Sequence, residues 1–226
     1  MLTGGAGGRA MGLAFEELFS IPDAFRGIPM AGRTDAWILG DAVASHGIPR
    51  DSPGLALFPE VYIRHLEMEI LNKGPGYGVM PGIPALLDAL ADRDDAYLAL
   101  LTGNYEAGAR LKLEHFDLWR YFPCGAFGDG AADRNGLVPK ALARVAACGG
   151  SLFAPSDAIV IGDTPLDVAC AKAGGARSIA VATGNHSVDE LRGTGADVVF
   201  EDLSDTQAVL AEIWRKRLGV EPSPPA

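Results

Sequence analysis

Two kinds of hydrophobic pattern divide the chain near residue 78. Before this point, apolar side chains recur at spacings of about three and four residues, which is typical of amphipathic helices. This pattern predicts helices over residues 8–19, 34–46 and 53–71. Beyond it, short apolar runs alternate with helical patterns, which predicts parallel strands joined by helices. The glycine-rich segment 73–78 separates the two regions and is expected to act as a hinge.

The region after the hinge alternates between strands and helices. Strands are expected over residues 96–101, 123–127, 158–161, 178–182 and 197–200. Helices are expected over residues 82–92, 105–115, 137–148, 166–173, 187–192 and 204–217. This order is typical of a doubly wound α/β fold with a parallel sheet. We therefore predict a small all-helical domain at 3–78, an α/β domain at 79–218 and a disordered proline-rich tail at 219–226.

Acidic residues follow the apolar run 158–161, which reads as a buried strand. Asp163 lies at its carboxyl edge, where open α/β sheets bind their ligands. Thr164 is a good N-cap and Pro165 suits the first position of a helix, so Asp167 can reach the same side as Asp163. Two carboxylates in one place repel each other unless a cation lies between them. An oxygen-seeking cation such as Mg²⁺ is the natural candidate.

A second strand end carries a hydroxyl group and a turn. Thr102, Gly103 and Asn104 close the strand at 96–101 and open the next helix. A hydroxyl beside exposed helix N–H groups can hold a phosphate oxygen. Further along the chain, Arg134 and Lys140 are cations that could neutralise phosphate charge and orient an acid.

Each of these candidates also has a structural interpretation. Asp163 could help to cap a helix, and Asp167 could be a solvated acid of the first turn that favours the macrodipole. Thr102 could be an N-cap and Gly103 a turn residue. Either of the two candidate cations could be a solvated surface side chain.

Composition narrows the classes of partner. The net charge of −10 argues against nucleic acid and anionic membranes, although a local cation would still admit a small anionic substrate. No run of about 18 apolar residues predicts a transmembrane helix. The three cysteines form no CxxC pair, so they indicate neither a zinc site nor a disulfide framework, and a reducing cytoplasm fits.

Taken in chain order, these motifs resemble those of the haloacid dehalogenase-like hydrolases, and within them the phosphoglycolate-phosphatase-like branch. The sequence LLTGN, with Thr102, is similar to the second motif of that family, and GDTPLD, with Asp163 and Asp167, to the fourth. For the cation of the third motif, Arg134 is the first choice and Lys140 the second. The resemblance covers nearly the whole chain, with the helical region as a cap over the α/β core.

The resemblance implies a Mg²⁺-dependent phosphatase that acts on a small phosphorylated metabolite through an aspartyl-phosphate. Asp163 would bind Mg²⁺, and Asp167 would support either the metal or the basic residue. Thr102, Gly103 and Asn104 would hold the phosphate.

The first motif of the family, an apolar strand that ends in Asp-x-Asp-Gly-Thr, does not occur in the 226 residues. The family places this strand at the centre of the sheet, between the strands expected at 96–101 and 158–161. We therefore expect a strand-wide gap, or a substitute strand, between these two. Direct pairing of the two would contradict this interpretation, in which either the start codon is assigned too late or the chain is a truncated form of the protein.

Other functions remain as alternatives. A non-catalytic domain that binds phosphate or Mg²⁺, or serves as an interaction module, would also lack the nucleophile. Carbon–halogen hydrolysis needs the same missing Asp but no metal, so the paired acids argue against it. Residues 5–10 match a dinucleotide fingerprint, but no strand precedes them, and a nucleotide-binding oxidoreductase is therefore disfavoured.

Overall fold

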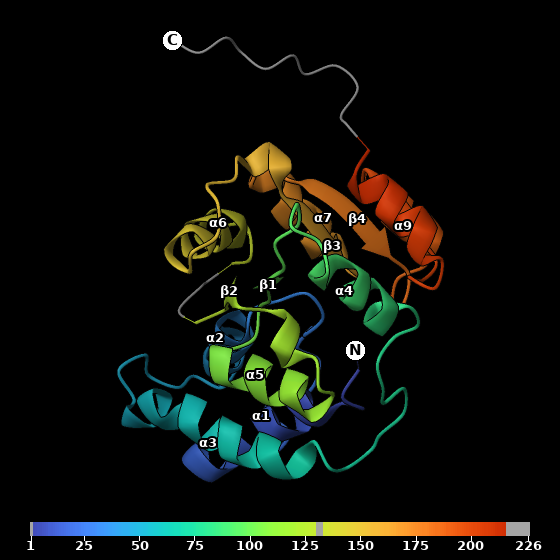
Figure 1. The fold of residues 1–226 in the computed structure, drawn as a ribbon. Coiled ribbons are helices and arrows are strands. Elements are labelled where there is room, and N and C mark those ends of the chain that lie inside the picture. Colours follow the sequence, from blue (N-terminus) through green and yellow to red (C-terminus); the bar gives the residue numbers. More distant parts are fainter. Residues whose placement is uncertain (1, 130–132, 216–226) are drawn as a thin grey trace.

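The computed structural model describes residues 2–129 and 133–215 (Figure 1). The tail expected at 219–226 and the last residues of the helix expected at 204–217 lie outside these ranges. Within the described part of the chain, no helix combines the length and hydropathy that crossing a membrane requires.

The amino-terminal region is helical, as its periodicity predicts. It contains α1 (Ala6–Phe19), α2 (Asp35–Ser45) and α3 (Pro53–Glu69). Figure 1 shows these helices together below the sheets. Phe15, Phe58, Tyr62 and Leu66 are fully buried where α1 packs against α3. These large side chains recur at helical spacing, so their burial holds the two helices together.

The remaining described residues alternate between parallel strands and helices. The strands are β1 (Ala99–Leu101), β2 (Cys124–Ala126), β3 (Ile159–Gly162), β4 (Arg177–Val181) and β5 (Val198–Phe200). The helices are α4 (Ile83–Ala91), α5 (Glu106–His115), α6 (Leu137–Ala147), α7 (Pro165–Ala173), α8 (Val188–Gly193) and α9 (Thr206–Ile213).

Helices cover both faces of the strands, which confirms the doubly wound α/β class. On one face, Leu86 of α4 and Val209 of α9 pack against Ile179 of β4. On the other face, Val168 of α7 and Leu191 of α8 pack against Ala180 of the same strand. Successive side chains of β4 thus enter opposite apolar layers, and every residue of this strand is buried.

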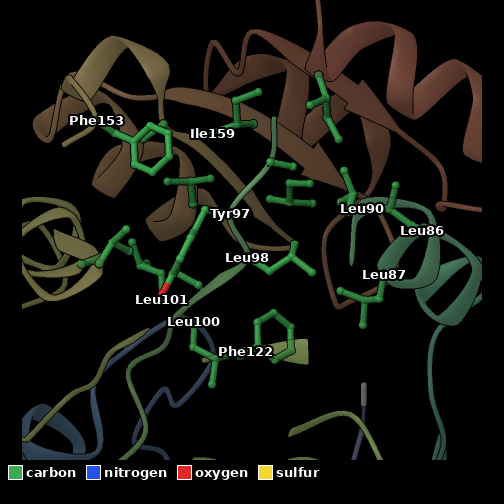
Figure 2. A pocket seen from close by; sticks show the side chains of 18 of the residues that line it. Leu86, Leu87, Leu90, Tyr97, Leu98, Leu100, Leu101, Phe122, Phe153 and Ile159 are labelled. Atoms are coloured by element: carbon green, nitrogen blue, oxygen red, sulfur yellow. The ribbon is translucent and has the colours of Figure 1, made fainter. Parts of the chain in front are cut away.

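The strands form two separate parallel sheets in the described chain, β1–β2 and β3–β4–β5. Strands β1 and β3 do not pair with each other, which agrees with the gap expected between them. A cavity of about 520 Å³, which we call the slot, is lined by residues of both strands and of α4 and α6 (Figure 2).

Several bounds of the sequence prediction are wrong. The helix expected at 204–217 begins at Thr206 and ends at Ile213, and the helix expected from residue 8 begins at Ala6. Two further differences concern strands that border the slot. Strand β1 begins at Ala99 rather than at residue 96, because it forms a ladder only with β2 among the described strands. The run 158–161 is not fully buried: Ile161 is 37% exposed, because it lines the slot instead of packing into a closed core.

Candidate functional site

The turn from β3 into α7 places the two predicted carboxylates. Asp163 follows directly after β3, and Thr164 is the N-cap of α7. The Thr164 hydroxyl oxygen accepts a hydrogen bond from the Asp167 backbone N–H at 3.3 Å, and Asp167 Oδ2 accepts one from the Thr164 backbone N–H at 3.0 Å. This reciprocal capping box confirms that a helix begins at the predicted position and directs the Asp167 carboxylate back towards the strand end.

Arg134 joins three segments of the chain at this position. It forms an ion pair with Asp167, in which the two side chains are 12% and 6% exposed. Its Nη1 donates to the Gly32 carbonyl at 3.2 Å, and its Nη2 donates to the Leu101 carbonyl at 3.3 Å. The guanidinium therefore connects the end of β1 to the capping box after β3 and to the helical region. Lys140, the second candidate, is exposed on α6.

Asp163 is a half-buried carboxylate without an ion pair in the described structure. Burial raises its pKa, and the neighbouring charge of Asp167 raises it further. The chain after β4 approaches it closely, since a Cβ added to Gly184 would lie 2.5 Å from Asp163 Oδ2. A carboxylate in this position would be stabilised by a cation.

The turn after β1 holds the residues predicted to bind phosphate. Thr102 Oγ1 accepts a hydrogen bond from the Asn104 backbone N–H at 3.2 Å, which leaves the hydroxyl proton free to be donated elsewhere. The Gly103 carbonyl accepts a hydrogen bond from the Asp35 backbone N–H at 2.7 Å. The Asn104 side-chain oxygen accepts one from Lys112, so that oxygen already has a protein partner.

A buried charged cluster beside this turn is not apparent from the sequence. Lys112 of α5 is 9% exposed, Asp35 of α2 is 4% exposed, and Asp35 Oδ2 accepts a hydrogen bond from the Tyr105 backbone N–H at 2.8 Å. Burial lowers the pKa of Lys112 and raises that of Asp35, and the Lys112 charge opposes the latter shift. The residues around Lys112 in the sequence do not distinguish it from a solvent-exposed lysine of a helix, so its burial could not be predicted from the sequence. The position of Gly184 near the site could have been predicted from the sequence, because it follows a strand as the other site residues do.

Three polar residues of the helical region have structural roles. Arg9 binds Glu69 and the carbonyl of Gly4. Arg33 forms an ion pair with Asp41, and its guanidinium stacks on the indole ring of Trp37. Thr34 is the N-cap of α2.

Asp163 and Asp167 are the carboxylates after β3 that could hold Mg²⁺. In the ranges that the structure describes, no three His, Cys, Asp or Glu side chains gather to hold a metal by themselves. Mg²⁺ does not require this, since it usually keeps several waters and binds one or two carboxylates together with substrate phosphate. Asp163, which forms no ion pair with the described residues and has a pKa raised by burial, fits such a ligand.

Comparisons with known proteins agree with this geometry. Residues 136–206 match the HAD-hydrolase-like family model. The chain is 28% identical over 137 residues to a probable phosphatase, IndB, of Dickeya dadantii, and this match covers 61% of the chain and 57% of that protein. The chain thus spans just over half of the length of this relative.

Two other similarities extend over more of the chain. A phosphoglycolate phosphatase of Rhodospirillum rubrum is 32% identical over 179 residues, which is 77% of this chain and 71% of that protein. The fold resembles the crystal structure of a predicted phosphatase from Clostridium acetobutylicum, with a TM-score of 0.63, 20% identity and 92% of each chain covered. These similarities and the motifs around Asp163 show that the chain belongs to the haloacid dehalogenase-like hydrolases.

Proposed function

We propose that this protein is a Mg²⁺-dependent phosphatase of a small phosphorylated metabolite that resembles phosphoglycolate. The observation that carries this proposal is the position of Arg134. It bridges the carboxyl end of β1 and the capping box after β3, next to Asp163, a carboxylate that forms no ion pair with the described residues. Two curated relatives bear phosphatase names, which supports the same reaction class.

Thr102 and Arg134 would each contact the phosphate of a bound monoester. The Thr102 hydroxyl would donate its free proton to a phosphate oxygen. The guanidinium of Arg134, held by Asp167, would offset the negative charge of the phosphate. Asp167 would therefore support the basic residue, which is one of its two expected roles.

Asp163 would hold Mg²⁺ together with phosphate oxygens and water. When bound, the metal would supply positive charge against the phosphate and so lower the repulsion that an incoming nucleophile meets. The raised pKa of Asp163 means that protons compete with the metal for this carboxylate.

A non-catalytic phosphate-binding or Mg²⁺-binding domain is the second candidate. The family resemblance assigns the attacking carboxylate to an Asp-x-Asp-Gly-Thr motif, and the 226 residues contain no such sequence. The groups that they do contain, Asp163, Thr102 and Arg134, are suited to binding Mg²⁺ and phosphate.

Phosphate release distinguishes the two functions. Purified protein would be incubated with phosphoglycolate, and with p-nitrophenyl phosphate, in the presence of Mg²⁺ or of a chelator. Mg²⁺-dependent release that is lost in Asp163→Asn and kept in Asp189→Asn, a matched change at an exposed side chain of α8, would support the phosphatase and would require a nucleophile other than an Asp-x-Asp carboxylate.

Binding measurements complete this test. If no phosphate is released but Mg²⁺ and inorganic phosphate bind saturably, and Asp163→Asn abolishes the binding, the non-catalytic candidate is correct. If the protein neither releases phosphate nor binds Mg²⁺ and inorganic phosphate, both functions are contradicted.

A further inference from the structure

We propose that Cys124 and Cys148 form a redox-active thiol pair, which a hydroperoxide converts to an intramolecular disulfide. This modification site lies at the amino end of β2, whereas the residues that would bind phosphate follow the carboxyl end of the parallel strand β1. The inference therefore does not rest on the proposed phosphatase function.

The two cysteines meet because α6 runs back along β2. Strand β2 begins at Cys124, and Cys148 is the C-cap of α6. The first turn of α6, at Leu137 and Val138, packs against Ala126 at the carboxyl end of β2. Cys124 lies two positions before Ala126, so its side chain points to the face of the strand that α6 covers. The helix thus returns Cys148 to the amino end of β2.

The side chains of the two cysteines are in contact in the structure. Both are free thiols, and a hydrogen bond joins them. The Tyr97 hydroxyl donates a hydrogen bond to Cys124 Sγ at 3.8 Å. The turn after Cys148 packs on the same ring, since a Cβ added to Gly150 would lie 2.9 Å from Tyr97 Cε2. One aromatic side chain therefore holds the surroundings of both thiols.

The backbone at the end of α6 fixes the position of Cys148. Gly149 has a φ of 86°, in the left-handed region that favours glycine. The Gly150 N–H donates a hydrogen bond to the Val145 carbonyl at 2.9 Å. Together these features form a Schellman motif, which ends the helix at Cys148 and keeps this residue beside β2.

The two thiols differ in their access to solvent, and this gives each a role. Cys148 is exposed, whereas Cys124 is 9% exposed and burial raises its pKa. A dissolved oxidant therefore reaches Cys148 first, and Cys124 is the resolving thiol. Cys170 is fully buried on α7 and donates a hydrogen bond to the Arg134 carbonyl at 3.0 Å, so it serves as an internal control.

The reaction transfers two electrons from the thiols to the hydroperoxide. The Cys148 sulfur attacks one peroxide oxygen, the O–O bond breaks, and the other oxygen leaves as water or an alcohol. The product is a sulfenic acid at Cys148. The Cys124 sulfur then attacks the Cys148 sulfur, the S–O bond breaks, and hydroxide leaves with the Cys124 proton as water. One S–S bond thus replaces two S–H bonds, and one peroxide is reduced.

Peptide mapping of the full chain tests the pairing. Reduced protein would be treated with a few equivalents of hydrogen peroxide and digested, without reduction, by trypsin and Asp-N. These proteases place each cysteine in a peptide of its own, 121–128, 145–156 or 167–172. We expect the first two peptides to become linked with the loss of two hydrogens, while the third keeps its thiol. Dithiothreitol should restore all three thiols.

Single substitutions separate the roles of the thiols. In Cys124→Ser, peroxide should convert Cys148 to a sulfenic acid that dimedone labels, without a cross-link. In Cys148→Ser, Cys124 should stay reduced at the same dose, because it is buried. Cys170→Ser is the matched control and should form the cross-link at the rate of the wild type.

The disulfide should also stabilise the chain. It would close a loop from residue 124 to residue 148 and restrict the unfolded state. The urea midpoint of the oxidised wild type should therefore lie roughly 1 M above that of the reduced protein. The midpoints of Cys124→Ser and Cys148→Ser should not rise with peroxide.

Three results of the mapping on the wild-type chain would overturn the proposal. The first is oxidation of Cys148 to a sulfinic acid, or to a disulfide between two chains, without a link to Cys124. The second is a mixture of pairings that includes Cys170, as an unfolded chain would give. The third is an unchanged number of thiols at excess peroxide. None of these results depends on phosphatase activity or on the folding of a variant.

Discussion

Replacement of Asp167 by Asn tests whether the pair with Arg134 organises the site. The variant keeps the shape of the side chain and an oxygen that can accept from the Thr164 backbone N–H. It removes the charge opposite Arg134. Because the two side chains are 12% and 6% exposed, the guanidinium would remain buried without a counter-ion. Loss of one partner of a buried ion pair costs about 3–5 kcal/mol, a large part of the roughly 5–15 kcal/mol that stabilises a domain.

Urea denaturation followed by circular dichroism measures this loss. With a slope of about 2 kcal/mol per molar urea, the unfolding midpoint should fall by roughly 1.5–2.5 M while the slope stays unchanged. Glu190→Gln is the matched control, because it alters the same position of the capping box of α8, where both partners are exposed. It should cost at most about 1 kcal/mol. An Asp167→Asn loss no larger than that of the control would refute the reasoning.

Three further predictions concern single residues. Since burial and Asp167 raise the pKa of Asp163, the folded state binds more protons, and the free energy of unfolding should fall as pH rises from about 3.9 through the raised pKa. Urea titrations at several pH values should show that Asp163→Asn removes this decrease in the free energy of unfolding with pH. The same decrease in wild type and variant would contradict the assignment to Asp163. Lys112→Met should lower the free energy of unfolding by about 1–3 kcal/mol, because the Asn104 side-chain oxygen loses its donor and buried Asp35 loses the nearby positive charge that opposes its raised pKa. The same change at exposed Lys140 should cost under about 0.5 kcal/mol, and equal costs would show that Lys112 is not a buried charge. Gly184→Ala should weaken Mg²⁺ binding in calorimetry, because its methyl group would lie 2.5 Å from Asp163 Oδ2; unchanged affinity would place the metal elsewhere.

Much of the fold follows from local sequence patterns. The helices of the amino-terminal region follow from apolar periodicity, since each helix needs only neighbours about three and four residues away to define its buried face. The start of α7 follows from Thr164 and Pro165, because capping depends on groups within one turn. The position of Asp163 at a strand end follows from the apolar run before it. Each of these features is decided within a few residues of chain.

Other features required the tertiary structure, because they depend on segments that are distant in the sequence. The motif order left both Arg134 and Lys140 as candidates, and only the packing of the loop before α6 against β1 and α7 brings Arg134 to the site. The buried charge of Lys112 has the same origin, since the nearby negative charge of Asp35 comes from another helix.

The strands that border the slot depend most strongly on tertiary structure. A strand is defined by hydrogen bonds to its neighbours, so the length of β1 and the exposure of Ile161 follow from the strands that lie beside them. The sequence by itself determined which segments become helices and strands. It also determined which polar side chains, such as Asp163 and Thr102, directly follow a strand. The tertiary structure decided which charges meet and which strand edges stay open, because charge pairing and sheet ladders are contacts between distant parts of the chain.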